Sequence, residues 1–172
     1  MSDFASVPMK FVGPIRIGSE ITSGEIEVPL ATYETPLWPS VNRGARVSMH
    51  TDKGIQCALI DDRMTRSILL EASDASDAVR ILQEIEKDDS DLISVAKSTS
   101  RFVKLIDIHS QVAGNLIFLR LAFKTGDAAG HNMCTKAAEA IMNHLLERFP
   151  SLKYESISGN YCSDKKATAV NG

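Results

Sequence analysis

The order of hydrophobic patterns between residues 66 and 158 constrains the fold of this chain more than any other feature. Residues 67–72 form a short apolar run that is typical of a buried strand. Apolar residues then recur at steps of three and four, which predicts a helix with Ser73 as its N-cap. A second short helix is expected through residues 92–96. The apolar stripe of the first helix consists of Ala75, Ala78, Val79, Leu82 and Ile85.

Two alternating segments at residues 101–112 and 115–124 predict a β-hairpin, because a glycine-containing turn lies between them. The glycine-rich segment 126–130 interrupts this pattern. Apolar residues at helical spacing then predict a helix that ends near Arg148, and a last strand is expected at residues 152–158. The order strand, helix, strand, strand, helix, strand predicts an α+β fold, a ferredoxin-like (βαββαβ) sandwich with helices on one face of an antiparallel sheet.

The two flanks do not belong to this unit. Residues 1–65 have a hairpin expected around Ser23-Gly24 and little helical period, and Leu37 and Trp38 are expected to be exposed if this part is isolated. Residues 158–172 are polar and too few to form a packed layer. The sequence therefore predicts a small domain at residues 66–157 between two pieces of a larger domain, at 1–65 and 158–172.

Composition excludes several classes of protein. The chain of 172 residues has 19 basic and 22 acidic side chains and a formal net charge of −3, whereas a general nucleic-acid binder needs a strong basic field. Its longest apolar runs fall far short of the roughly 20 residues of a membrane helix. Its three cysteines and four histidines show no metal-ligand spacing. We expect a cytoplasmic protein with reduced thiols, no metal, no nucleic acid and no membrane partner.

A glycine-rich segment lies between a predicted strand and a predicted helix, at residues 126–133 (GDAAGHNM). Glycines let a backbone approach a ligand closely, and a helix N-terminus offers unpaired N–H groups to an anion such as a pyrophosphate. The spacing G-x-G-x-x-G is not present, so an ordinary strand-to-helix turn is the alternative interpretation.

Two further segments carry candidate chemistry. Residues 158–166 (SGNYCSDKK) place two lysines beside an aspartate, a combination that can hold a carboxylate or stabilise an oxyanion; the alternative is a solvated surface. Residues 34–44 begin with Glu34, whose carboxyl group can donate a proton near neutrality if an apolar pocket raises its pKa. The alternative for Glu34 is an ordinary surface residue.

Together these segments resemble one family. VPLATYE, SVNRG, MTR, STSRF, GDAAGHNM and SGNYCSDKK occur in the order and with the spacing of 3-hydroxy-3-methylglutaryl-CoA reductase, from about residue 7 to the last residue. STSRF and SGNYCSDKK make the chain similar to the NADPH-using class shared by eukaryotes and archaea. The resemblance implies reduction of hydroxymethylglutaryl-CoA to mevalonate with two NADPH and release of CoA. It also implies a small cofactor domain inserted into a large substrate domain.

The resemblance assigns a role to each motif residue. Glu34 is expected to protonate the aldehyde-level intermediate and Lys165 to stabilise the developing oxyanion. Ser100 and Arg101 are expected to contact the 2′-phosphate of NADPH. The residues expected to bind the hydroxymethylglutaryl group are Arg66, Ser158, Asn160, Asp164 and Lys166. The residues expected to line the dinucleotide are Asp127, Ala128, Ala129, Gly130, His131, Asn132 and Met133.

The chain departs from the family pattern at several places. The family usually has methionines at the positions of Ala129 and His131, and a proline at the position of Ala167. The family's catalytic aspartate and histidine lie downstream of the position of Gly172, so we expect little or no reductase activity from this chain alone. Family members form dimers, so a homodimer or the C-terminal half is the expected partner. The alternatives are a non-catalytic NADP(H)-binding module and an interaction domain without a nucleotide site.

Overall fold

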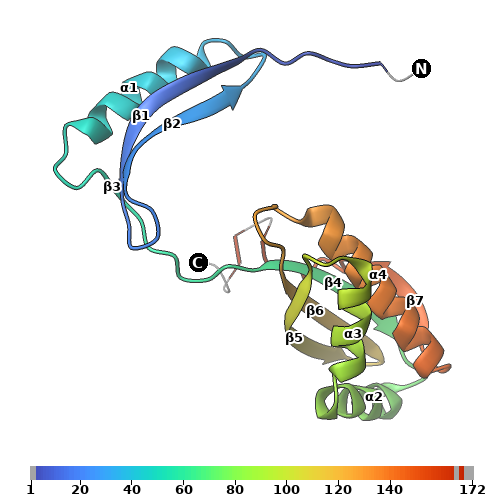
Figure 1. Cartoon of the computed structure of the whole chain (residues 1–172). Helices are drawn as coiled ribbons and strands as arrows, with labels where there is room; N and C mark the ends of the chain where they lie inside the picture. Colours follow the sequence, from blue (N-terminus) through green and yellow to red (C-terminus); the bar gives the residue numbers. More distant parts are fainter. Residues whose placement is uncertain (1–2, 165–166, 169–172) are drawn as a thin grey trace. The chain divides into compact units, whose positions relative to one another are not determined.

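The computed structural model describes residues 3–164 and 167–168, and its fold is α+β. The chain divides into two compact units, Met1–Asp61 and Asp62–Gly172, each with its own sheet (Figure 1). In the part of the chain that the structure describes, no helix is both long and apolar enough to cross a membrane.

The first unit is a curved hairpin with a helix packed along it. Strands β1 (Met9–Gly18) and β2 (Gly24–Ala31) pair antiparallel, which confirms the hairpin expected around Ser23-Gly24. Helix α1 (Leu37–Met49) packs against β1. The two-residue strand β3 (Ile55–Gln56) then pairs parallel with the end of β1, so the sheet order is β2-β1-β3.

Helix α1 corrects two expectations about this unit. The prediction of little helical structure in residues 1–65 is wrong, because Pro36 and Pro39 lie at the N-cap and in the first turn, where a helix tolerates proline. The second concerns Trp38, which was expected to be exposed if this part is isolated. Trp38 is 8% exposed and its Nε1 donates to the Leu30 carbonyl oxygen of its own hairpin at 2.9 Å, while Leu37 is half-buried. Trp38 is therefore the anchor that holds the helix to the hairpin.

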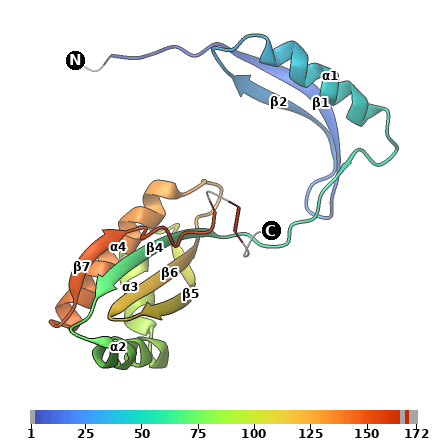
Figure 2. The ribbon, with the colours of Figure 1, turned by 180° about the vertical axis from the view of Figure 1, so that it is seen from behind.

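The second unit contains one antiparallel sheet with strand order β5-β6-β4-β7. Helices α3 and α4 lie together on one face of this sheet, in front of it in Figure 1 and behind it in Figure 2. Its elements in chain order are β4 (Met64–Glu71), α2 (Ala75–Lys87), α3 (Ser90–Thr99), β5 (Lys104–Ala113), β6 (Leu116–Lys124), α4 (His131–Arg148) and β7 (Lys153–Ile157). The predicted order of elements, the hairpin and the end of α4 are confirmed.

The core of the second unit lies between the sheet and the helices. Alternate residues of β4 and β6, such as Ile68 and Leu119, are fully buried and pack against α4 residues such as Ile141. In α2 the buried stripe runs through Ala78, Ile81 and Ile85. Val79 is 45% exposed, so its assignment to that stripe is wrong, and Ile81 takes its place on the buried face.

The cap of α2 differs by one residue from the prediction. Asp74 is the N-cap, and its Oδ1 accepts a hydrogen bond from the Asp77 backbone N–H at 2.8 Å. Ser73 Oγ instead donates to the Asp77 carboxylate at 2.8 Å. The reason is that an N-cap side chain bonds to the N–H two or three residues later, and Asp74 has that spacing to Asp77.

Candidate functional site

The register of the second sheet brings three sequence motifs to one end of it. The start of β4 pairs with the end of β6, with Met64 opposite Phe123, and the start of β5 pairs there too, with Lys104 opposite Lys124. Segment 98–102 therefore leads into this end of the sheet, and segment 125–133 leaves from it. These motifs are distant in the sequence and become neighbours because the strands are antiparallel.

The turn between β6 and α4 has the geometry that its glycines permit. Gly126 and Gly130 have φ values of +66° and +82°, a region that other residues rarely adopt. A Cβ atom on Gly130 would overlap the side chain of Thr125, whose Oγ1 donates to the Ala128 carbonyl oxygen at 2.6 Å. Gly130 is the N-cap of α4 and makes no side-chain capping bond, so the first N–H groups of the helix face the turn. No atom lies within 4 Å of the position that a Cβ atom on Gly126 would take, so a ligand can approach the backbone of the turn there.

A contact between side chains joins the two motifs expected to bind a dinucleotide. Ser100 Oγ lies 3.9 Å from Met133 Sδ, and Lys136 Nζ donates to the Thr99 carbonyl oxygen at 3.4 Å. Arg101 is exposed, and its guanidinium carbon lies 4.6 Å from the ring centroid of Phe102. The Arg101 cation, the Phe102 ring and the N-terminus of α4 therefore lie near one another, where α3 ends and α4 begins.

Within this cluster most of the expected cofactor residues are exposed. Ser100, Gly130 and Met133 are half-buried, and Met133 packs against the hydrophobic core. The exposed members are Arg101, Asp127, Ala128, Ala129, His131 and Asn132. His131 and Asn132 stand in the first turn of α4, and that turn contains no acidic residue. An anion at this helix end meets no opposing carboxylate from the helix itself.

The segment after β7 is tied back to the beginning of β4. Asp164 Oδ1 accepts hydrogen bonds from the backbone N–H of Thr65, at 2.8 Å, and from Thr65 Oγ1. The Ser163 N–H donates to Thr65 Oγ1 at 3.1 Å. Further along, the Ser67 N–H donates to Cys162 Sγ at 3.3 Å. This places Asp164 at the same end of the sheet as the glycine-rich turn.

Three buried polar atoms near this segment have no hydrogen-bond partner among the described residues: Arg66 Nε, Ser67 Oγ and Asp164 Oδ2. Buried polar atoms are normally paired, so such a group of orphans marks a place where a polar ligand or water completes the network. Arg66 and Asp164 belong to the set expected to bind substrate. An arginine donates to a carboxylate, and a carboxylate accepts from a hydroxyl.

The remaining expected site residues are Ser158, Asn160, Glu34, Lys165 and Lys166. Ser158 is half-buried and Asn160 exposed, and both have positive φ, at 99° and 56°. Glu34 belongs to the first unit, where it is exposed in the turn before α1 and its N–H donates to Thr32 Oγ1 at 2.9 Å. Lys165 and Lys166 lie outside the described residues.

Sequence reasoning missed Thr65 and Ser67, which hold the segment after β7. Thr65 lies in the MTR motif and Ser67 in the predicted strand, but neither was given a role, because that role depends on the pairing of β4 with that segment. Tyr161 and Cys162 stood inside a motif that was recognised, but their contacts could not be deduced from it.

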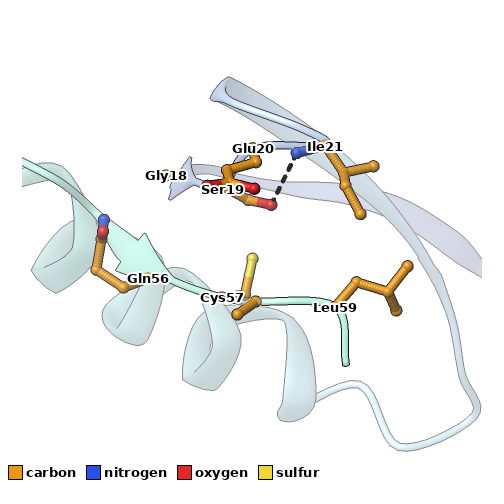
Figure 3. Close-up of a pocket in the computed structure, with 8 residues that line it drawn as sticks. Gly18, Ser19, Glu20, Ile21, Gln56, Cys57 and Leu59 are labelled. Carbon is orange, nitrogen blue, oxygen red and sulfur yellow. Dashed lines mark hydrogen bonds between the residues drawn. The ribbon is translucent and has the colours of Figure 1, made fainter. Parts of the chain in front are cut away.

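The first unit contains a hollow of about 430 Å³ that involves none of the expected site residues. Figure 3 shows it between the turn after β1 and the segment after β3, with the Cys57 side chain pointing toward the turn. Ser19 Oγ there accepts a hydrogen bond from the Ile21 N–H at 3.2 Å. Among the described residues there is no group of three or more His, Cys, Asp or Glu side chains that could hold a metal ion.

Comparison with known proteins gives consistent matches over nearly the whole chain. The chain is 40% identical to the 3-hydroxy-3-methylglutaryl-coenzyme A reductase of Pyrococcus abyssi, over 99% of this chain and 42% of that protein. It is 39% identical to the 3-hydroxy-3-methylglutaryl-coenzyme A reductase of Strongylocentrotus purpuratus, over 98% of this chain and 18% of that protein. The chain therefore spans about two fifths of the length of its archaeal relative.

Among solved structures, the class II 3-hydroxy-3-methylglutaryl-CoA reductase of Streptococcus pneumoniae, in open conformations bound to NADPH, has the same fold. The TM-score is 0.71 at 17% identity, and the match covers 95% of this chain and 44% of that one. The sequence profile of the hydroxymethylglutaryl-coenzyme A reductase family matches residues 3–172. The protein therefore belongs to the hydroxymethylglutaryl-coenzyme A reductase family.

Proposed function

We propose that this chain is the portion of a 3-hydroxy-3-methylglutaryl-CoA reductase that binds NADP(H), and that the whole protein reduces hydroxymethylglutaryl-CoA to mevalonate with two NADPH. The observation that carries the proposal is the contact between Ser100 and Met133, at 3.9 Å, which joins the two dinucleotide motifs at one end of the sheet. Identity of 40% with an archaeal reductase and 39% with a eukaryotic one supports the NADPH-using class.

Residues 66–157 of the second unit are proposed to be the ferredoxin-like cofactor domain. The element order, the antiparallel strand order β5-β6-β4-β7 and the helices on one face support this assignment. Residues 1–65 and 158–172 are then parts of the large substrate domain. The separate sheet of the first unit supports its assignment to a different domain.

The residues at the end of the sheet fit a phosphorylated dinucleotide. Open space lies where a Cβ atom on Gly126 would be, which permits close approach to the backbone of the turn, and α4 offers its N-terminal N–H groups to a pyrophosphate. Arg101 binds the 2′-phosphate through charge-assisted hydrogen bonds, with Ser100 beside it. Asp127 to Met133 line the dinucleotide. NADPH supplies hydride when it is bound, and the protein supplies position and charge.

The residues proposed to act on the substrate are the ones that the family resemblance assigns. Arg66 binds the hydroxymethylglutaryl carboxylate, and the orphaned Nε of Arg66 and Oδ2 of Asp164 support polar contacts there. Ser158, Asn160 and Lys166 complete this set. Lys165 stabilises negative charge on the carbonyl oxygen, and Glu34 protonates the aldehyde-level intermediate.

The assembly is proposed to be a homodimer, or a complex with the polypeptide that corresponds to the C-terminal half of the relatives. The location is proposed to be cytoplasmic, and three cysteines that are far apart in the sequence, at positions 57, 134 and 162, support it because they show no disulfide pattern.

Titration of the chain with NADPH and NADH tests this function. The parent chain is expected to bind NADPH more tightly than NADH, and Arg101→Ala is expected to weaken NADPH binding at least tenfold with little effect on NADH, because only NADPH carries the 2′-phosphate. Lys153→Ala is the matched control, since Lys153 is an exposed cation opposite Glu71, at the other end of β4.

Isothermal titration calorimetry or NADPH fluorescence measures both affinities. Equal affinity for the two cofactors, or an unchanged NADPH affinity in Arg101→Ala, contradicts the assignment of this site. Binding of neither cofactor favours the alternative of an interaction domain.

A further inference from the structure

The segment Ser158–Asp164 crosses the face of the second sheet that is opposite the helices. Ile68 and Leu119 point toward the helices and are fully buried, whereas their neighbours Leu69 and Phe118 point to the opposite face. A Cβ atom on Gly159 would lie 3.1 Å from Leu69 Cβ and 3.6 Å from Phe118 Cδ1, so the backbone of the segment rests on this face. We call residues 158–164 the crossing loop.

The crossing loop has an unusual backbone. Ser158, Gly159 and Asn160 are three successive residues with φ of 99°, 50° and 56°. This region is costly for Ser and tolerable for Asn, so the loop keeps this conformation only where surrounding contacts hold it. Both ends are held by β4, through the Ser158 N–H, which donates to the Ser67 carbonyl oxygen at 2.6 Å, and through Asp164.

Tyr161 holds the middle of the crossing loop to β5 and β6, and Cys162 Sγ, which accepts a hydrogen bond from the Ser67 N–H at 3.3 Å, holds it to β4. The Tyr161 hydroxyl lies 2.6 Å from Nδ1 of His109 on β5, and the Tyr161 ring meets Phe118 edge-on with centroids 5.8 Å apart. The guanidinium carbon of Arg120 lies 5.0 Å from the same ring. His109 and Arg120 are opposite each other in the β5–β6 register, so Tyr161 ties the loop to β5 and β6, whereas its two ends are tied to β4.

These contacts have the strength to order a loop. The edge-to-face arrangement of Tyr161 and Phe118 is a favourable geometry for two rings. The guanidinium of Arg120 over the Tyr161 ring adds a cation–π attraction. Tyr161 also closes the turn itself, because its N–H donates to the Ser158 carbonyl oxygen at 3.0 Å. Tyr161 therefore links the sheet to the backbone conformation of residues 158–160, because its ring contacts the sheet and its N–H closes their turn.

We propose that Tyr161 is a positioning residue that holds the crossing loop on the sheet and thereby places Ser158 and Asp164 for a substrate that carries a carboxylate and a hydroxyl group. The substrate half of this inference rests on the function proposed above, and the docking half does not. Tyr161 acts on the substrate only through the loop. On the sheet it contacts His109, Phe118 and Arg120.

A buried thiol of the crossing loop itself reports directly on docking. Cys162 is 6% exposed and follows Tyr161, whereas Cys134 is fully buried in the core and Cys57 is exposed. In a Cys57→Ser background, 5,5′-dithiobis(2-nitrobenzoate) then reacts with Cys162 only when the loop lifts, and with Cys134 only when the core opens. Peptide mass mapping identifies which thiol has reacted.

Tyr161→Ala is expected to raise the rate of Cys162 modification at least tenfold and to leave Cys134 slow. Tyr161→Phe keeps the ring contacts and loses the bond to His109, so its rate is expected to lie between those of the parent and Tyr161→Ala. Tyr154→Ala is the matched control, because Tyr154 is 53% exposed on β7. An unchanged Cys162 rate in Tyr161→Ala overturns the docking role, and a rise in both thiol rates shows general unfolding and overturns it as well.

Binding measurements on the full chain test the substrate half. Tyr161→Ala is expected to weaken binding of hydroxymethylglutaryl-CoA at least fivefold while NADPH affinity stays within twofold, and Tyr161→Phe is expected to restore most of the loss. A faster Cys162 reaction with unchanged hydroxymethylglutaryl-CoA affinity overturns the positioning role. Failure of the parent chain to bind hydroxymethylglutaryl-CoA instead overturns the substrate part of the proposed function, and the thiol rates still decide whether Tyr161 holds the loop.

Discussion

Gly130 shows how a single residue limits what the candidate site can tolerate. Its φ is +82°, and a Cβ atom there would overlap Thr125, so two separate penalties apply to any other side chain. Gly126 also has positive φ, at +66°, but open space lies where its Cβ would be. An alanine at Gly126 would therefore meet backbone strain alone, whereas an alanine at Gly130 would meet both backbone strain and steric overlap with Thr125.

Gly130→Ala is therefore expected to destabilise the protein more than Gly126→Ala. A left-handed conformation costs an L-residue roughly 1–2 kcal/mol, which applies to both variants, and the displacement of Thr125 adds on the order of 1 kcal/mol to Gly130→Ala alone. Urea denaturation measures the free energy of unfolding, and NADPH titration is expected to show weaker binding for Gly130→Ala. Equal destabilisation of the two variants contradicts the overlap with Thr125.

Among the elements, α3 and α4 are joined by a cluster of charges at the end remote from the glycine-rich turn. Asp91, in the first turn of α3, accepts a hydrogen bond at its Oδ2 from Arg148 NH1, at 2.9 Å, and contacts His144 Nε2 at 2.7 Å. Burial raises the pKa of Asp91, but the hydrogen bond with His144 and the charge of Arg148 lower it more, so that its pKa lies below the ordinary value of 3.8. The ionised carboxylate therefore stabilises the folded state.

Because the pKa of Asp91 is lower in the folded state, its contribution to stability is complete above about pH 4 and is lost as the pH falls below that value. Asp91→Asn is expected to reduce stability at pH 7 by about 0.5–1 kcal/mol and to flatten the fall in stability below pH 4. Part of the fall remains, since Arg80 also lowers the pKa of Asp77, to about 2.

Urea denaturation at several pH values between 2 and 7 measures this effect. Asp89→Asn is the control, since Asp89 is the N-cap of α3 and makes no side-chain capping bond. Parallel pH curves for Asp91→Asn and the parent chain are the result that contradicts the role of Asp91.

Helix α1 shows where periodicity in a sequence is an insufficient guide to an element. In the second unit each element buries one face against its neighbours, so the apolar spacing of residues 67–157 predicted the element order correctly. In α1, Asn42 and Ser48 face the hairpin and accept hydrogen bonds from the backbone N–H groups of Gly13 and Arg16. Polar residues share the packed face with Trp38 and Ala45, and Pro36 and Pro39 lie at the start of the helix, so its pattern was not recognised as helical.

At the scale of the whole molecule, motifs identified the candidate site but did not determine which residues meet. The contact of Ser100 with Met133, and that of Thr65 with Asp164, join residues 33 and 99 positions apart. Such contacts depend on the register of a four-stranded sheet, which is set by all of its strands together. The motifs therefore indicated which kinds of side chain the candidate site contains, but only the folded structure shows which of these side chains contact one another.

The unequal cores of the two units lead to a prediction about their autonomy. The second unit holds a continuous core from Ile68 to Leu152, whereas the buried apolar residues of the described part of the first unit are Val12, Trp38 and Ala45. A polypeptide of residues 62–172 is expected to fold alone with one cooperative transition, within a few degrees of the main transition of the full chain. Residues 1–61 alone are expected to lack a cooperative transition, because so small a core does not offset chain entropy.

The same polypeptide of residues 62–172 is expected to bind NADPH within about twofold of the full chain, because every residue proposed to contact the cofactor belongs to the second unit. Circular dichroism on heating and NADPH titration provide the measurements, with Arg101→Ala in both lengths as the control for specific binding. If the shorter polypeptide folds but loses NADPH, residues of the first unit belong to the cofactor site. If it fails to fold, the second unit depends on the first for its stability.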